Sequence, residues 1–398
     1  MICKITKEKI KPFMSFGKMP IANGFLKQKQ FKNEFFFNLE VGFSKSVSLF
    51  QLNEHPKPKQ MFNKNYPFFT GSSKNMIKHF KKYSDWIKKN YGKKIKKLIE
   101  IGSNDGTFLN NFDNKRYNVI GFEPSKNVAQ ISRKKGIKTI NKFFNYNNAK
   151  KYKKLKNDID IITAANAICH VPNLISLIKG VNFLLKDKGV FIFEEPYLGS
   201  MYSKGSYDQI YDEHIFIFSL TSVDKIFSLF GFELIDGIPQ KTHGGSMRYV
   251  IARKGIFKKS KRLNKLLFNE KLKNIDNYKG CLNFKKKCED SKKKLISKLK
   301  KYKKKKLRVA GYAATSKSTT ILNYCNIDSG YLDYICDTTR EKIGKYSPGM
   351  HIPIVSMEHF KNNPPDKAFL FAWNHKKEIF NKEREYTKKN GWFAHIKI

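Results

Sequence analysis

Side chains that can transfer protons are concentrated in one short stretch, YDQIYDEH at 207–214. These eight positions hold two tyrosines, three carboxylates and one histidine. A histidine beside a carboxylate is a suitable general base, because the acid can orient the ring and stabilise the imidazolium. We therefore interpret His214, with Glu213 beside it, as a candidate base, and Tyr211 as a donor to a developing oxyanion. A structural loop rich in aromatic residues is the alternative interpretation.

A glycine-containing turn, LIEIGSNDG at 98–106, carries a second set of polar residues. An apolar strand runs into the turn, where Gly102 allows the backbone to approach a ligand closely. Gly106 allows tight entry into a helix that we expect to begin near Thr107. Glu123 follows about twenty residues after the turn, where an acid at the end of the second strand can bind both ribose hydroxyls.

The centre of this turn distinguishes two classes of cofactor. A dinucleotide enzyme would carry GxGxxG to hold a pyrophosphate, whereas Asn104 and Asp105 stand here. Their polar and acidic groups suit the methionine end of S-adenosylmethionine better than a diphosphate. Asn166 and His170 follow the third candidate strand, where ligands bind in open α/β sheets, although His170 could equally be a buried structural histidine. The residues that we predict to bind S-adenosylmethionine are Glu100, Gly102, Asn104, Asp105, Gly106, Glu123 and Asn166.

The segment THGGSMR, 242–248, combines a flexible backbone with a fixed cation. We interpret it as a substrate-facing turn that leads into a strand, with His243 and Arg248 as substrate-binding residues. An ordinary hairpin turn with a solvated Arg248 is the alternative.

Alternating strands and helices must position these residues. Strands separated by helical segments indicate a parallel sheet, and the candidate strands lie at 98–101, 117–123, 158–166 and 189–196. The apolar spacing of 76–92 predicts an amphipathic helix. A late hairpin over 232–253 predicts an antiparallel edge.

These elements divide the 398 residues into several domains. The expected fold class is α/β, with a class I methyltransferase Rossmann-like domain, a small irregular β-rich domain before it and a second, smaller α/β Rossmann-like domain after it. We place the N-terminal domain at 1–75, the methyltransferase domain at 76–255, a Lys-rich helical connector at 256–306 and the C-terminal domain at 307–398.

The formal charge of +46 indicates little about partners. It comes almost wholly from lysine, with Asn, Ile and Phe also abundant, which is typical of an AT-rich genome. Nucleic-acid readers rely on bidentate arginine, so we expect no nucleic-acid partner. No apolar run reaches the roughly 18–20 residues of a membrane span, and the first residues lack a signal-peptide core, so we expect a cytoplasmic protein without membrane contact. The six cysteines form no CxxC pair and are expected to be reduced.

Ordered matches along almost the whole chain carry a resemblance to a known family. They are GKMPIANGFL, NYPFF, EIGSNDG, ANAICHVPNL, YDQIYDEHIFIFSLTS, HGGSMRYV, GYAATSKSTTILNYC and SPGMHIPI. The sequence resembles the nucleotide-sugar C-methyltransferases, three-domain enzymes that methylate C3 of dTDP-4-keto-deoxysugars. The resemblance implies S-adenosylmethionine as the cofactor and a nucleotide-sugar substrate.

The resemblance also implies roles for single residues. His214 would be the catalytic base, paired with Glu213, while Tyr211 and His170 would line the same pocket and handle the ketone oxygen and the proton. Tyr66 would close over the substrate, and the C-terminal domain would hold the nucleotide diphosphate. The further substrate-binding residues that we expect are Tyr207, Tyr312, Lys317 and Asn323, with Ala313 beside them.

The sequence departs from the family in two places. The family's N-terminal domain binds zinc through two CxxC pairs, but here only Cys3 remains, and the other positions read Thr6, Ser44 and Val47. One thiolate cannot form a tetrahedral zinc site, so we expect no metal in this domain, which would be held by its Phe and Tyr core. Asp212 stands where many relatives carry histidine, which affects the local pH behaviour but not the base.

Two other functions stay open at this stage. A methyltransferase acting on RNA or DNA would need aromatic stacking platforms and arginine-rich grooves, and the sequence has neither. A non-catalytic relative that binds the cofactor or the sugar nucleotide is suggested by the lost cysteines, while the intact Tyr211, Glu213 and His214 argue against it. We expect a monomer or a homodimer, and the sequence does not name the sugar or the nucleotide base.

Overall fold

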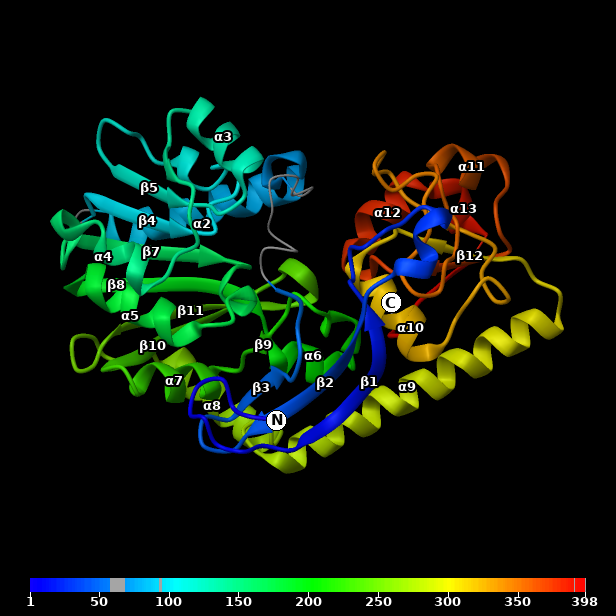
Figure 1. Ribbon diagram of the computed structural model, residues 1–398, viewed down its shortest axis with the longest axis horizontal. Helices are drawn as coiled ribbons and strands as arrows, with labels where there is room; N and C mark the ends of the chain where they lie inside the picture. Colours follow the sequence, from blue (N-terminus) through cyan, green and yellow to red (C-terminus); the bar gives the residue numbers. More distant parts are fainter. Residues whose placement is uncertain (58–68, 93–94, 390, 398) are drawn as a thin grey trace.

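The described residues form three β-sheets, one in each part of the chain (Figure 1). The structure is a computed structural model that describes residues 1–57, 69–92, 95–389 and 391–397. A four-stranded sheet forms the N-terminal part, a seven-stranded sheet the middle part and a five-stranded sheet the C-terminal part. In Figure 1 the middle and C-terminal parts lie at opposite sides of the molecule, and the long strands β1 and β2 run between them.

The seven-stranded sheet confirms the predicted α/β class. Its order is β6-β5-β4-β7-β8-β11-β10, in which β11 is antiparallel to both neighbours and the other pairs are parallel. The expected hairpin is therefore present, and its second strand lies inside the sheet instead of at the edge. The strands are β4 (Lys97–Ile101), β5 (Asn118–Phe122), β6 (Lys138–Ile140), β7 (Ile159–Ala165), β8 (Leu185–Pro196), β10 (Phe232–Gln240) and β11 (Ser246–Arg253).

Helices cover both faces of this sheet, because successive strand residues point to opposite sides. α2 packs Phe80 and Tyr83 on the face that includes Leu98, whereas α5 and α7 pack on the face that includes Ile99. The helices of the middle part are α2 (Lys74–Tyr91), α3 (Lys126–Lys134), α4 (Tyr146–Lys150), α5 (Leu174–Leu184), α6 (Leu198–Lys204) and α7 (Leu220–Ser228).

One expected helix does not form after the glycine turn. The chain makes only a short 3-10 turn, Leu109–Asn111, where a helix was expected to begin near Thr107. The stretch NNFDN (110–114) is rich in Asn and Asp, whose side chains bond nearby backbone and favour turns over helices. Phe108 is buried, so this turn packs directly onto the sheet.

The N-terminal sheet has the order β1-β2-β3-β9, and its last strand comes from the middle part of the chain. β9 (Phe216–Ile217) pairs antiparallel with β3 (Leu49–Leu52) and follows His214 almost directly. β1 lies at the sheet edge, where the prolines that begin and end it are tolerated. The two longer strands are β1 (Pro12–Pro20) and β2 (Phe36–Ser44).

The C-terminal sheet is parallel throughout, in the order β14-β13-β12-β15-β16. Its strands are β12 (Val309–Tyr312), β13 (Ile335–Cys336), β14 (Ile354–Val355), β15 (Lys367–Leu370) and β16 (Trp392–Phe393). Its helices are α10 (Ser316–Cys325), α11 (Met357–Asn362), α12 (Lys376–Lys382) and α13 (Arg384–Lys388).

Two helices connect the middle and C-terminal parts, α8 (Lys261–Leu272) and α9 (Tyr278–Lys304), as the Lys-rich pattern predicts. α9 buries Cys281, Phe284 and Cys288 at helical spacing. No helix in the described ranges is long and apolar enough to cross a membrane.

The four positions that hold zinc in the resembled family offer one thiol here. Cys3 is buried, and its Sγ accepts the backbone N–H of Thr6 at 3.4 Å. The Glu8 carboxylate accepts from the hydroxyls of Ser44 and Ser46, the latter at 2.9 Å. These hydrogen bonds, with that of Ser44 the largest cause, lower the pKa of Glu8. The residues do not fit tetrahedral zinc, and hydrogen bonds to Glu8 join the two segments instead.

Purified protein should therefore contain no stoichiometric zinc. The variant Glu8→Ala should lower the melting temperature by about 2–4 °C, because losing these hydrogen bonds costs about 1 kcal/mol. Elemental analysis and thermal denaturation measure the two effects. A triple variant, Thr6→Cys with Ser44→Cys and Val47→Cys, restores four thiols with Cys3 and is the zinc-binding control. About one zinc per wild-type chain would show the interpretation to be wrong.

Candidate active site

The expected cofactor residues meet at the carboxyl ends of β4, β5 and β7, which are neighbours in the sheet. Gly102 follows β4 with a φ of 71°, a conformation that side chains rarely adopt. A Cβ at Gly102 would lie 2.7 Å from the Cβ of Ala167, so the turn packs against the chain that leaves β7. Asn166 begins that chain and Gly106 ends the turn, both with positive φ, at 52° and 76°.

Three carboxylates surround the turn. Glu100 is buried, and its Oε2 has no hydrogen-bond partner within the described ranges. Burial, with the nearby charges of Asp105 and Glu123, holds the pKa of Glu100 well above its ordinary value. Burial also raises the pKa of Glu123, whose two carboxylate oxygens accept the backbone N–H groups of Asn104 at 3.0 Å and Ser125 at 2.7 Å.

This concentration of acid in a basic chain fits S-adenosylmethionine. The cofactor carries cationic sulfonium and ammonium groups, which a cluster of carboxylates stabilises. Glu123 retains lone pairs for the ribose hydroxyls, since each carboxylate oxygen can accept twice. The pyrophosphate of a dinucleotide would be repelled at the same place.

The side chains of Asn104 and Asp105 shape the wall of this site. Asn104 Oδ1 accepts the N–H of Thr70 at 2.9 Å, and Asp105 Oδ2 accepts the N–H of Gly71 at 2.9 Å. Asp105 Oδ1 also accepts from the Thr107 hydroxyl at 2.6 Å. Both residues therefore hold the segment before α2 over the glycine turn.

His214 is buried, and both nitrogens of its ring have partners. Nδ1 lies 2.6 Å from the carbonyl oxygen of Gln209, and because a carbonyl only accepts, Nδ1 carries the proton. Nε2 lies 2.9 Å from the Tyr211 hydroxyl. Nε2 is therefore the basic nitrogen of the neutral ring.

The surroundings of His214 keep it neutral. Burial is the largest cause that holds its pKa well below the ordinary value, and the charges of His170, His243 and Lys317 act in the same direction. The Gln209 hydrogen bond opposes these effects without reversing them. A neutral imidazole at neutral pH is the form that can accept a proton.

The expected pairing of His214 with Glu213 does not form. The Glu213 carboxylate accepts from Asn23 Nδ2 at 3.1 Å, and its backbone carbonyl meets His170 Nδ1 at 2.7 Å. In each of these histidine rings, Nδ1 thus lies within hydrogen-bond distance of a backbone carbonyl. Adjacent residues of this non-helical segment project in different directions, which sequence adjacency could not indicate.

Glu195 fixes the turn that carries His170. Its Oε1 accepts, at 2.6–3.2 Å, from the backbone N–H groups of Ala167, Ile168 and Cys169. The ring centroids of His170 and His214 lie 5.3 Å apart. The structure therefore brings the predicted His170, Tyr211 and His214 together in one cluster.

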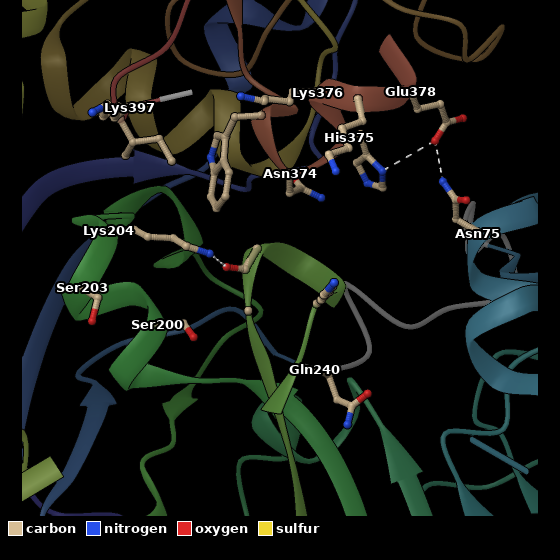
Figure 2. Close-up of a pocket in the computed structure, with 16 residues that line it drawn as sticks. Asn75, Ser200, Ser203, Lys204, Gln240, Asn374, His375, Lys376, Glu378 and Lys397 are labelled. Carbon is tan, nitrogen blue, oxygen red and sulfur yellow. Dashed lines mark hydrogen bonds and ion pairs between the residues drawn. The ribbon is translucent and has the colours of Figure 1, made fainter. Parts of the chain in front are cut away.

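A cavity of about 900 Å³ lies between the middle and C-terminal parts. Figure 2 shows Lys204 of α6 on one side and Asn374, His375 and Lys376 on the other. The lysines that line it are Lys204, Lys241, Lys376, Lys377 and Lys397, and Glu378 is the one carboxylate among its described lining residues. Its size is typical of ligand pockets, roughly 300–1,000 Å³. Its charge suits an anion such as a diphosphate.

Lys317 and His243 lie close enough to the cluster of His170, Tyr211 and His214 for their charges to act on His214. Lys317 Nζ donates to Asn374 at 3.0 Å and lies 4.6 Å from the ring centroid of Trp373, and both partners line the cavity. His243 has a φ of 51°, and its buried Nε2 lacks a hydrogen-bond partner in the part of the chain that is described. Burial, with the Lys317 charge, lowers the pKa of His243 to about 3.

Two expected substrate residues are buried structural groups instead. Arg248 Nε donates to Glu194 at 2.7 Å, and Glu194 also meets His79 Nε2 at 2.6 Å. Arg248 is thus neither substrate-facing nor solvated. Tyr207 is fully buried, with its hydroxyl 3.3 Å from Cys325 Sγ, so it packs between the domains.

The residues expected to hold the nucleotide are only partly brought to the cavity. Tyr312 is buried and donates to Glu383 at 2.9 Å, while Asn323 donates to two backbone carbonyls at 2.9 and 3.0 Å. Both support the C-terminal domain from within, and Lys317 reaches residues of the cavity. Tyr66 lies outside the described residues.

Sequence reasoning missed several residues of the site. The backbone carbonyl of Gln209 has no sequence signature, because every residue has a backbone carbonyl. Glu195 and Asp208 lie in segments that stand out in the sequence, but no role was predicted for either of them. Trp373 ends the apolar run AFLFAW (368–373), just beyond β15, and a tryptophan at the carboxyl end of a parallel strand was a usable signal.

Three family models match the chain. The model "Methyltransferase domain" matches residues 76–236, and the model "C-methyltransferase C-terminal domain" matches residues 241–396. A model of a zinc-binding domain matches residues 3–62. The C-methyltransferase NovU of Streptomyces niveus is 27% identical over 384 residues, which cover 96% of this chain and 91% of NovU.

Similar solved structures are more distant. A S-adenosylmethionine-dependent methyltransferase of Clostridium acetobutylicum is 14% identical with a TM-score of 0.36, over 44% of this chain and 92% of that one. The PH0226 protein of Pyrococcus horikoshii is 16% identical with a TM-score of 0.37, over 47% of this chain and 95% of that one. At these scores the likeness carries no conclusion about function.

The glycine turn with its carboxylates and the matched methyltransferase model define the class of protein: it is a S-adenosylmethionine-dependent methyltransferase. Domain models follow one another from residue 3 to residue 396, and NovU matches across nearly the whole length. The chain is similar to C-methyltransferases along nearly its whole length, through the C-terminal domain model and through NovU.

The assignment of Arg248 to the core predicts a stability effect. Glu194→Ala should lower the free energy of unfolding by about 3–5 kcal/mol, because it leaves the Arg248 cation buried without its partner. Asp85→Ala breaks the exposed Lys81–Asp85 pair and should cost below about 1 kcal/mol. Urea denaturation measures both values, and equal losses in the two variants would contradict the assignment.

Proposed function

We propose that the enzyme methylates the carbon next to the ketone of a nucleotide-linked 4-keto-deoxysugar. The observation that carries this proposal is a neutral histidine on which the charge of Lys317 acts, while Lys317 itself contacts residues of a lysine-lined cavity. A carbon acid next to a ketone needs a base, and a diphosphate needs cations. The name of NovU, a C-methyltransferase, supports a carbon acceptor.

His214 is the proposed general base. Its Nε2 accepts the proton from the carbon next to the ketone, while Nδ1–H stays on the Gln209 carbonyl and stabilises the imidazolium that forms. Tyr211, whose hydroxyl now contacts Nε2, turns to donate to the enolate oxygen, and the ring of His170 lies beside that of His214 in the same cluster. The methyl group comes from S-adenosylmethionine held by Glu100, Gly102 and Glu123.

The lysine-lined cavity holds the nucleotide diphosphate in this proposal. Lys204 and Lys376 line it from opposite sides (Figure 2), so two phosphates can each have a cation. Lys317 and His243 lie toward the catalytic cluster and would contact the sugar. Binding energy from the diphosphate would thus place the sugar beside His214.

Incubation with S-adenosylmethionine and a panel of dTDP- and CDP-linked 4-keto sugars, followed by mass spectrometry, tests the proposal. We expect a gain of one CH2 unit on a sugar of the panel. Methyl incorporation into RNA or DNA, with none into any sugar, would favour a nucleic-acid methyltransferase. Cofactor binding without methylation of either class would indicate a non-catalytic relative.

His214→Ala should lower kcat by roughly 10²–10⁴-fold, since it removes the base, and leave S-adenosylmethionine binding unchanged. Isothermal titration calorimetry measures the binding. His359→Ala, at an exposed histidine of the C-terminal domain, is the matched control and should keep full activity. Turnover that persists in His214→Ala would exclude this base.

The pH dependence of wild-type kcat should also reflect the lowered pKa of His214. Only the neutral ring accepts a proton, so activity is lost as the pH falls through this pKa, which lies well below 6.5. We expect kcat to stay level from about pH 8 to pH 6.5. An acid limb centred at or above 6.5 would contradict the assignment.

A further inference from the structure

Alternate residues of the catalytic segment 207–214 contact the two flanking domains. The intervening residues Gln209 and Tyr211 contact His214 instead. The residues that bond outward are Asp208, Ile210 and Asp212.

Asp208 is buried against two side chains of the C-terminal domain. Trp373 Nε1–H donates to its Oδ2 at 2.7 Å, and His395 Nε2 lies 3.2 Å from its Oδ1. Burial alone would raise the pKa of Asp208, but the charges of His395 and Lys317 and the Trp373 hydrogen bond outweigh it and hold the pKa below the ordinary value. A buried carboxylate is stable only while it is paired, so these partners fix Asp208 in one position.

Two neighbouring threonines of α10 hold the rest of the segment. The Thr320 hydroxyl donates to the carbonyl of Ile210 at 3.0 Å. Asp212 Oδ1 accepts the N–H of Ala22 at 3.0 Å, and the carbonyl of Ala22 accepts from the Thr319 hydroxyl at 2.8 Å. One turn of α10 thus binds the segment directly and through the N-terminal domain.

We propose that the C-terminal domain positions the catalytic base by fixing the backbone carbonyl of Gln209 through Asp208 and Ile210. Gln209 lies between two anchored residues, which restricts the rotation of its carbonyl. That carbonyl decides which ring nitrogen of His214 is basic. Trp373 and Thr320 are therefore positioning residues, although neither touches His214.

Trp373 also connects this anchoring to the substrate cavity. Its ring lines the cavity, with the Nζ atoms of Lys317 and Lys204 at 4.6 and 5.6 Å from the ring centroid. Its N–H holds Asp208 on the opposite side. The same side chain that borders the substrate site thus holds the segment that orients the base.

Hydrogen exchange tests the anchoring without any substrate. Trp373→Phe removes the N–H donor and keeps an aromatic ring, and we expect the amides of 209–214 to exchange at least about fivefold faster, because the segment opens more often. Trp392→Phe is the matched control: it removes an indole donor to Thr387 inside the same domain and should leave these amides unchanged. Unchanged exchange in Trp373→Phe, or equal acceleration in the control, would overturn the proposal.

Steady-state kinetics test the consequence for catalysis, and this half rests on the proposed function. Thr320→Val removes the hydroxyl at nearly constant shape, and Thr320 does not line the cavity. We expect kcat to fall about tenfold with KM unchanged, since a displaced base slows proton transfer, and Thr320→Ser should restore most of the turnover.

The two experiments separate the possible failures. A raised KM with unchanged kcat in Thr320→Val would show that Thr320 acts on substrate binding, and the positioning proposal would be wrong. If wild-type enzyme methylates no sugar of the panel, the proposed function fails, and the exchange result alone decides whether the C-terminal domain anchors the segment.

Discussion

The hydrogen bond between Nδ1 of His214 and the carbonyl of Gln209 is the contact on which the catalytic arrangement depends. It leaves the lone pair on Nε2, and burial keeps the ring neutral. Replacing the side chain of Gln209 would not remove this backbone carbonyl. Its direction is set by the residues on either side, which explains why costly buried polar groups such as Asp208 occur there.

The two candidate binding regions differ in the kind of ionisable side chain that they gather. The glycine turn gathers Glu100, Asp105 and Glu123, whereas the interdomain cavity gathers lysines. A cationic cofactor and an anionic substrate would therefore each find its own region. The net charge of +46 describes neither region, because most of it lies on lysines distributed over the whole surface.

Much of the fold could be predicted because apolar residues recur at the spacings that strands and helices require. The strands that carry Glu100, Glu123 and Asn166 stand out as short apolar runs between helices, and the structure places them side by side. Residue types also located the cluster of His170, Tyr211 and His214. The domain limits and the individual roles of these residues stay predictions.

The sequence could not indicate the direction in which each side chain points. Arg248 and Tyr207 have the chemistry of substrate-binding residues, yet their side chains turn into the core, and only the packing of α2 and α10 decides that. The orientation of His214 depends on a carbonyl, which every residue possesses. Residue identity therefore selected the candidate site, while tertiary contacts decided which of its members face one another.

The short strand β9 has a consequence for how such enzymes can be recombined. Because Phe216 and Ile217 complete the N-terminal sheet, the first domain is not a self-contained module. Excised after β3, it would expose an unpaired strand edge, a known route to aggregation. Chimaeras between relatives that exchange this domain would have to transfer β9 with it, and so would also transfer the chain around the catalytic base.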